Sequence, residues 1–475
     1  MSLRGKSSKI LNILLINLLI SLNLFAQETT SWYGELKLPT TSLPITLKIE
    51  EKKDTTIILM GSPSQTNEMF SVTRQRLTQD SILFTIKTHS IVFRGRYNST
   101  RDTIFSTFKQ GFLQEELVLI KTKELFETRR PQEPKPPYPY IEEELGFKVE
   151  GVNYDFNGTL TLPSKEGRYP CVILITGSGL QNRDEELMNH KPFKVIADYL
   201  SRKGIAVYRY DDRGWNGDIT DSVIVNSTTL DFAIDAQAAF EMLRNHPNID
   251  PTKIGMLGHS EGGVIASIAT SKNKDIDFLI LLASTGQKGI DVLIQQNEVI
   301  LRNIKMPEHA VNMQVSALKQ IYKYIEKDYS DEKITKRMNK WFEKELSKLT
   351  QEQRKESQFL IPMERTKFIN QLSSNWMRNF LKINPYDYLI KVQQPTLALN
   401  GTHDVQVLYQ HNLPPIEKAL KKAKNKNYII YKAIGHNHLF QQSTTGMIDE
   451  YSKIEQTISP IILEQIEEFI RNTTR

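Results

Sequence analysis

The most informative part of the sequence reads Lys253-Ile254-Gly255-Met256-Leu257-Gly258-His259-Ser260-Glu261-Gly262-Gly263. Its centre, Gly258-x-Ser260-x-Gly262, is the nucleophile-elbow pattern, in which the glycines leave room for a strained turn that lifts the serine hydroxyl above a sheet. The run before the serine is β-prone, and the small residues from Val264 to Ala269 favour a helix. The pattern therefore predicts strand, turn and helix, with Ser260 as the candidate nucleophile.

Length, charge and cysteine content limit the number of domains and the kinds of partner and cofactor that we expect. At 475 residues the chain is long enough for two folded units. The formal net charge is +6, and it falls to +3 without the three cations of the N-terminal segment, Arg4, Lys6 and Lys9. This balance indicates no nucleic-acid partner. The single cysteine, Cys171, begins an apolar run and is interpreted as a buried small hydrophobe. With scattered histidines and no H-E-x-x-H pattern, we expect neither a metal nor a cofactor.

The first 26 residues resemble a secretory signal. A basic start precedes the apolar run from Ile10 to Phe25, which asparagines interrupt and which ends in Ala26-Gln27. We therefore expect a signal peptide over residues 1–26, a secreted or periplasmic mature protein, and no stable membrane insertion after processing. A membrane anchor is the alternative, although the run is short for a span. A lipoprotein anchor is excluded because no cysteine occurs at the cleavage point.

Residues 27–128 predict a small all-β sandwich or barrel. Turn residues separate short β-branched and aromatic runs, and no long helical period interrupts them. The expected strands are Tyr33 to Leu38, Ile45 to Ile49, Thr55 to Met60, Met69 to Thr73, Ile82 to Lys87, Ser90 to Gly95, Thr103 to Phe108 and Glu116 to Ile120. The only histidine in this region is His89 and carboxylates do not cluster, so we interpret it as non-catalytic. The proline-rich residues 129–144 are interpreted as a linker.

Residues 145–475 predict an α/β domain with a mostly parallel central sheet and helices on both faces. Phe147 to Tyr154 and Gly158 to Leu162 suggest an antiparallel hairpin. The expected core strands are Cys171 to Ile175, Ile205 to Tyr210, Ile254 to Leu257, Phe278 to Ala283, Thr396 to Leu399 and Tyr428 to Tyr431. Helices are expected between them, notably Leu230 to Leu243 and Ser459 to Arg471.

One gap between strands is much longer than a crossover needs. About 110 residues separate Ser284 from Gln394, whereas a dozen would suffice for a parallel connection. Helical spacing, as in Val311, Val315 and Leu318, predicts a helical cap insertion over about residues 285–385. The alternative is a solvent-exposed insertion that lies far from the catalytic residues.

Candidate partners for Ser260 follow two later strands. Asp404 lies in the loop after Thr396 to Leu399, and His436 and His438 follow the next strand. The order serine, acid, histidine is the one that the elbow fold requires. Spacing leaves the choice between the two histidines open, because both lie in one loop, and the more distant His403 and His411 compete with them.

An acyl-transfer serine also needs donors for the oxyanion. The backbone N–H of Glu261, directly after the nucleophile, is one candidate, and the N–H of Ser178 in the glycine-rich loop after Ile175 is the other. A phosphate cradle is the alternative for this loop, but the Rossmann spacing and the P-loop lysine are missing. The charged runs Asp211-Asp212-Arg213 and Arg183-Asp184-Glu185 are interpreted as structural ion pairs.

Several phrases of residues 145–475 resemble the α/β-hydrolase superfamily, specifically its secreted bacterial esterase branch, which is related to dienelactone hydrolases and S9-type serine peptidases. They are Gly158-Thr159-Leu160-Thr161-Leu162-Pro163, Ile175-Thr176-Gly177-Ser178-Gly179, Tyr210-Asp211-Asp212-Arg213-Gly214, Gly258-His259-Ser260-Glu261-Gly262-Gly263 and Asn437-His438-Leu439-Phe440-Gln441. The resemblance implies the nucleophile Ser260, the acid Asp404 in Gly401-x-x-Asp404-x-Gln406-Val407, and the histidine His438. Leu180 departs from the proline that relatives usually have there.

The expected function is hydrolysis of carboxylic esters by a secreted serine enzyme, through a triad and an acyl-enzyme. The substrate would be a small-molecule or polysaccharide-linked ester. One alternative is an S9-like aminopeptidase or acylaminoacyl peptidase. Such peptidases usually carry a large propeller, whereas only about 100 residues precede the proline-rich segment here, without a repeat. The other alternative is an inactive binding protein on a hydrolase scaffold.

Overall fold

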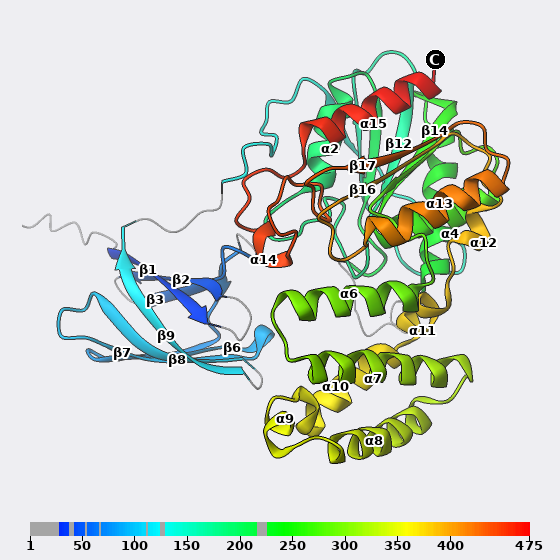
Figure 1. Ribbon diagram of the computed structural model, residues 1–475. Coiled ribbons are helices and arrows are strands. Elements are labelled where there is room, and N and C mark those ends of the chain that lie inside the picture. Colours follow the sequence, from blue (N-terminus) through cyan, green and yellow to red (C-terminus); the bar gives the residue numbers. More distant parts are fainter. Residues whose placement is uncertain are drawn as a thin grey trace, which may run out of the picture. The chain divides into compact units, whose positions relative to one another are not determined.

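The computed structural model describes residues 28–37, 42–52, 55–65, 68–110, 113–123, 129–215 and 226–475. The chain forms two compact units, residues 1–128 and residues 129–475 (Figure 1). The expected signal peptide, residues 1–26, lies outside the described residues. Within the described ranges, none of the helices has the length and apolar character that a membrane span needs.

The first unit is a single nine-stranded antiparallel sheet in the order β4-β3-β2-β1-β9-β8-β7-β6-β5. Its strands are β1 (Glu28–Lys37), β2 (Ser42–Lys52), β3 (Thr55–Gly61), β4 (Phe70–Ser71), β5 (Arg74–Leu77), β6 (Ser81–Ile86), β7 (Ile91–Tyr97), β8 (Thr103–Gln110) and β9 (Leu113–Thr122). The prediction of an all-β N-terminal region is therefore confirmed. Strand β5 was missed, because Arg74-Gln75-Arg76 lacks the apolar alternation that marks a half-buried strand.

Alternation explains how this sheet encloses a core. In β6, Ile82, Phe84 and Ile86 are buried while their neighbours face outward, as the two-residue period of a strand requires. The short chain between the edge strands links both ends of the sheet. Val72 N–H donates to Ile58 O of β3 at 3.2 Å, and the next residue bonds to β6.

The second unit contains an eight-stranded mixed sheet in the order β10-β11-β13-β12-β14-β15-β16-β17. Its strands are β10 (Ile141–Glu144), β11 (Gly158–Leu162), β12 (Tyr169–Ile175), β13 (Ala206–Tyr210), β14 (Ile249–His259), β15 (Leu279–Leu282), β16 (Thr396–Gly401) and β17 (Tyr428–Ala433). Six neighbouring strands of this sheet are parallel, namely β13, β12, β14, β15, β16 and β17. Strands β11 and β10 extend the sheet beyond β13 in antiparallel pairing. The hairpin partner of β11 is thus β10, with β13 on the other side, rather than the expected Phe147 to Tyr154. Among the described residues of that expected strand, Phe147 alone makes a bridge, to Phe156.

Helices cover both faces of this sheet, as the sequence predicted (Figure 1). Residues of α2 (Pro192–Ser201) and α15 (Pro460–Thr473) enter the core on one face. The other core takes residues of α4 (Thr229–Arg244), α5 (Glu261–Lys272) and α13 (Tyr409–Lys422). The short helices α12 (Tyr386–Leu389) and α14 (Ile448–Tyr451) complete this part. Cys171 is buried in β12, as predicted.

The proline-rich segment is bonded to the second unit. The buried guanidinium of Arg130 donates to the carbonyls of Met188 and Asn189 and to those of Ser452 and Ile454, at 2.9 to 3.2 Å. The last four residues of the segment form β10. Residues 129–144, which we interpreted as a linker, are thus anchored to the α/β unit by charged hydrogen bonds and by strand pairing.

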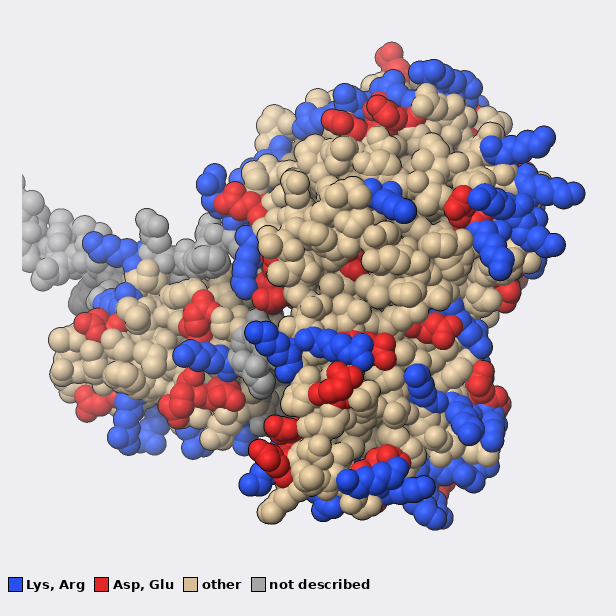
Figure 2. All heavy atoms as spheres, viewed as in Figure 1, with Lys and Arg blue, Asp and Glu red and all other residues tan. Residues whose placement is uncertain are grey.

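A run of helices occupies the long gap between β15 and β16 (Figure 1). They are α6 (Gly289–Asn303), α7 (Glu308–Glu326), α8 (Asp331–Ser347), α9 (Gln351–Lys355), α10 (Pro362–Ser373) and α11 (Asn375–Lys382). They pack around their own apolar cluster, to which α8 contributes Ile334, Met338, Phe342 and Leu346 at helical spacing. Their outer face carries both signs of charge side by side, so no single-sign patch covers the visible side of this helical insertion (Figure 2).

Candidate active site

Ser260 lies at the sharp turn between β14 and α5. Its φ of 53° and ψ of −118° are strained for a residue with a side chain. The flanking glycines make this turn possible: a Cβ on Gly258 would lie 2.1 Å from the carbonyl oxygen of Gly262, and one on Gly262 would lie 2.2 Å from that of Ile175. The turn holds the Ser260 side chain at the carboxyl end of the sheet, on the wall of a cavity.

Asp404 and His438 are neighbours at the same end of the sheet. Oδ2 of Asp404 lies 2.7 Å from Nδ1 of His438, and both side chains are buried. The other oxygen of Asp404 accepts the backbone N–H groups of Gln406 and Val407 at 2.8 and 2.9 Å. The carboxylate is thereby fixed in orientation, and it can hold His438 with the proton on Nδ1 and Nε2 free to act as a base. His438 lines the same cavity as Ser260.

His436 points elsewhere. Its Nδ1 lies 2.8 Å from the carbonyl oxygen of Ile434, and it does not line the cavity. Burial lowers the pKa of its imidazole. Of the two histidines that spacing left undecided, His438 is therefore the one that lies beside Asp404 and lines the same cavity as Ser260.

The two expected oxyanion donors flank the serine. Ser178 lines the cavity, and Glu261 begins α5 directly after Ser260. Neither backbone N–H has an acceptor in the part of the chain that the structure describes. The N–H of Gly177, by contrast, is used internally, because it donates to Oε1 of Glu185 at 2.9 Å. The free N–H groups of Ser178 and Glu261 can stabilise a negative oxygen at this point.

The side chain of Glu261 has a second role that sequence reasoning missed. Its buried carboxylate accepts hydrogen bonds from Ser178 Oγ and Thr229 Oγ1, each at 2.7 Å, and from Trp376 Nε1 at 3.0 Å. Burial raises the pKa of this carboxyl, and the three donors oppose that rise. One carboxylate thus joins the Ser260 turn to the loop after β12, to α4 and to α11 of the insertion. An acid directly after the serine is the only sequence signal of this connection.

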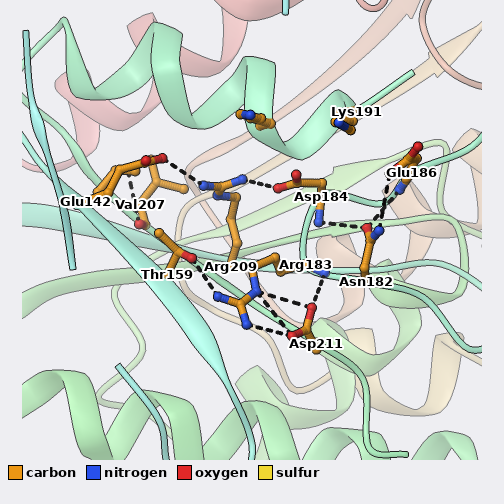
Figure 3. Close-up of polar contacts among 12 residues, drawn as sticks. Glu142, Thr159, Asn182, Arg183, Asp184, Glu186, Lys191, Val207, Arg209 and Asp211 are labelled. Atoms are coloured by element: carbon orange, nitrogen blue, oxygen red, sulfur yellow. Dashed lines mark hydrogen bonds and ion pairs between the residues drawn. The ribbon is translucent and has the colours of Figure 1, made fainter. Parts of the chain in front are cut away.

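Most of the charged runs form structural ion pairs, as the sequence indicated, whereas Glu185 at the end of the second run lines the cavity. Figure 3 shows the crossed pairs: Arg183 bonds to Asp211, at 2.6 Å at its closest, and Arg209 to Asp184. Beside them Asp212 accepts Thr176 Oγ1 at 2.7 Å and Gln181 N–H at 2.8 Å, and burial raises its pKa to about 8. These bonds fix both ends of the glycine-rich loop, and with it Ser178.

The cavity beside Ser260 has a volume of about 320 Å³. The α/β sheet and its loops supply Gly177, Ser178, Gln181, Glu185, Leu187, His259, Ser260, Thr285, Gln406, Val407, His438 and Leu439, and the helical insertion supplies Val292, Leu293, Gln296, Trp376, Met377 and Phe380. The insertion's share comes from α6 and α11 and is mostly apolar. Among the described residues, no cluster of three or more histidine, cysteine or acidic side chains is arranged for a metal ion.

The sheet order, the strained serine turn and the placement of a histidine and an acid after the later strands define an α/β-hydrolase. The family model of the serine aminopeptidases, S33, matches residues 190–443, which is more than half of the chain. The chain therefore belongs to this family, and it is a hydrolase.

Two curated relatives match part of the chain. Esterase EstD of Thermotoga maritima is 30% identical over 156 residues, which cover 32% of this chain and 35% of the esterase. Acyl-coenzyme A thioesterase 1 of Mus musculus is 28% identical over 168 residues, covering 34% of this chain and 36% of the thioesterase. The matches thus span about a third of each relative's length.

Solved structures give more distant matches. Est1E from Butyrivibrio proteoclasticus has a TM-score of 0.40 at 16% identity, with 70% of this chain and 98% of that chain covered. The acylaminoacyl peptidase of Pyrococcus horikoshii has a TM-score of 0.43 at 10% identity, with 90% of this chain and 54% of that chain covered.

Proposed function

We propose that this protein hydrolyses carboxylic esters through Ser260, His438 and Asp404. The Ser260 hydroxyl attacks the acyl carbon while Nε2 of His438 takes its proton, and the N–H groups of Ser178 and Glu261 bind the oxyanion. His438 then protonates the leaving alkoxide, and the acyl group stays on Ser260. Water attacks this acyl-enzyme and loses a proton to His438, which returns it to Oγ of Ser260 as the acyl C–O bond breaks and the carboxylic acid leaves.

The hydrogen bonding of the carboxylates at the cavity is the observation that favours an ester substrate over a peptide with a free amino terminus. Glu185 is the only acidic residue that lines the described cavity, and its Oε1 already accepts from Gly177 N–H and faces His259 Nδ1. Glu261, just outside, accepts three internal donors. An aminopeptidase must bind a substrate ammonium, and a buried ammonium needs a carboxylate partner. The one carboxylate of the cavity is thus already shared between His259 and the Gly177 N–H.

Charge also argues against a coenzyme A thioester. Such a substrate carries several phosphate charges, which proteins usually bind with lysine or arginine. None of the described residues lining the cavity is a lysine or an arginine. The cavity volume of about 320 Å³ is at the lower end of the range for small-molecule sites, which favours short- to medium-chain acyl groups.

In this proposal the helical insertion acts as a cap. Its residues Val292, Leu293, Met377 and Phe380 would exclude water from the acyl chain. Export through the N-terminal signal, and a small-molecule or polysaccharide-linked ester as the natural substrate, belong to the same proposal. N-terminal sequencing of the exported protein tests export, with Gln27 expected as the first residue.

The activity is tested with a panel of p-nitrophenyl esters against free aminoacyl and N-acetyl-aminoacyl nitroanilides, per titrated active site. Ester turnover should be faster, and Ser260→Ala should lower it by three orders of magnitude or more. Faster cleavage of the anilides would identify a peptidase, with the N-acetylated substrate separating an acylaminoacyl peptidase from an aminopeptidase. A wild-type chain that a fluorophosphonate does not label would support the inactive binding protein instead.

A further inference from the structure

Glu185 and His259 form a buried pair directly behind the candidate catalytic residues. His259 ends β14 and precedes Ser260, and Glu185 lies in the loop that follows β12. Nδ1 of His259 is 2.9 Å from Oε1 of Glu185, and its Nε2 is 2.9 Å from the carbonyl oxygen of His438. The two side chains are only 9% and 4% exposed. Both ring nitrogens of His259 therefore face oxygen atoms.

The chemistry of these neighbours decides the protonation of His259. A peptide carbonyl can accept hydrogen bonds but not donate them, and the same is true of an ionised carboxylate. A neutral imidazole carries one N–H, so it could satisfy one of the two oxygens and would set a bare nitrogen against the other. Oε1 of Glu185 also accepts the N–H of Gly177 at 2.9 Å, so this oxygen already acts as an acceptor. An imidazolium beside a carboxylate satisfies every one of these contacts.

We propose that His259 is an imidazolium held by Glu185, and that this pair is a positioning device for the hydrolytic site. It fixes the backbone of His438 through the His438 carbonyl, and it fixes the oxyanion loop through Gly177 N–H, one residue before Ser178. Three loops that follow different strands are thereby held at one ion pair next to Ser260. The inference rests on the proposed ester hydrolysis for its kinetic consequences, but the ion pair itself can be observed without any substrate.

The charged groups around His259 determine how the device responds to pH. Glu185 faces it from the loop after β12, and the ring of His438, with Asp404 behind it, lies at a centroid distance of 4.7 Å. Burial would lower the pKa of His259, but the Glu185 carboxylate outweighs this effect and the pKa lies above its usual value. The pair therefore keeps its cation as long as the pH stays below this raised pKa. As the pH rises through the raised pKa, His259 loses a proton and one of its two bonds.

The kinetic test compares the full chain with Glu185→Gln and with Glu186→Gln, which removes the same charge from the exposed neighbouring residue. The wild type should lose kcat/KM for p-nitrophenyl butyrate at alkaline pH. Glu185→Gln should lower kcat/KM at least about tenfold near neutral pH, because the His259 cation loses its partner, and should move the alkaline limb to lower pH. Glu186→Gln should retain the wild-type profile. An equal loss at every pH in Glu185→Gln, with the limb unmoved, would overturn the proposal.

A spectroscopic test is independent of turnover. The full chain, labelled with ¹⁵N-histidine, gives ring resonances that report protonation, and those of His259 are assigned by their loss in His259→Asn. Both ring nitrogens of His259 should be protonated at neutral pH in the wild type. One protonated and one bare nitrogen would overturn the proposal. If esters are not substrates, the rate of fluorophosphonate labelling replaces turnover in the pH profiles, so a wrong substrate class and a wrong positioning role give different results.

Discussion

At the scale of single residues, the orientation of two neighbouring histidines separates the proposed base from a structural group. His438 is bonded to Asp404 through Nδ1 and lines the cavity, whereas His436 is bonded to a backbone carbonyl two residues away. We therefore predict that His438→Ala lowers kcat for an aryl ester by three orders of magnitude or more. His436→Ala should stay within about tenfold of the wild type, since its loss affects packing alone. Steady-state kinetics on both variants decides, and the opposite ranking would contradict the proposed triad.

His190 predicts a pH dependence of stability. Burial and the nearby charge of Arg130 lower its pKa to about 4, and its Nδ1 lies 3.0 Å from Thr457 Oγ1. Between that pH and its ordinary value of about 6.5, the unfolded chain binds a proton that the folded chain does not. The free energy of unfolding should therefore fall as the pH drops through this window, by up to about 3 kcal/mol from this one group.

The measurement is urea denaturation between pH 4 and pH 7. The fall should be shallower in His190→Gln, whereas His411→Gln, which changes an exposed histidine of α13, should keep the wild-type slope. Equal slopes in all three proteins would show that His190 does not titrate in this way.

At the scale of elements, Trp376 ties α11 of the helical insertion to the nucleophile turn. Its Nε1 donates to the buried carboxylate of Glu261 at 3.0 Å, and its ring packs near Phe380 at the cavity. Trp376→Phe keeps an aromatic ring but removes the donor. We predict a fall in kcat/KM for esters of about tenfold and a lower melting temperature, because a charged buried acceptor loses one of its partners.

The matched control is Trp341→Phe on α8, where the indole packs against Phe342 inside the insertion. Its kcat/KM should stay within about twofold of the wild type, since it is not among the cavity-lining residues. If both variants lost activity equally, general loosening of the insertion would explain the effect and the Glu261 bond would not.

At the scale of the whole molecule, every residue that lines the described cavity lies between Gly177 and Leu439, in the second unit. The first unit has a separate apolar core. We predict that a chain of residues 129–475 folds and hydrolyses small soluble esters with a kcat/KM within about threefold of the full chain. A chain of residues 145–475 should be less stable by several kcal/mol, because it lacks β10 and the Arg130 hydrogen bonds. Thermal unfolding and ester kinetics of both truncated chains test this, and an inactive but folded 129–475 chain would contradict it.

Sequence alone was sufficient for much of the architecture. The strand, turn and helix around Ser260 follow from local rules, since a glycine two residues away on each side permits the strained turn. Two-residue alternation identified most strands of the first unit, and continuous apolar runs identified the parallel strands of the second. The two missed strands, β5 and β10, lacked these periodic signals, and β10 is the hairpin partner of β11 that the sequence assigned elsewhere.

What the sequence determined by itself is therefore whatever depends on near neighbours: the elbow, the periodic elements, and the candidates Ser260 and Asp404. Only the tertiary structure could choose between His436 and His438 by geometry, because that choice depends on which ring meets an aspartate 34 residues away. The same holds for Glu185 with His259 and for Glu261 with Trp376, whose partners are 74 and 115 residues apart. A side-chain hydrogen bond needs atoms within about 3 Å, and residues so distant along the chain are brought to that separation only by the packing of strands and helices around a shared core.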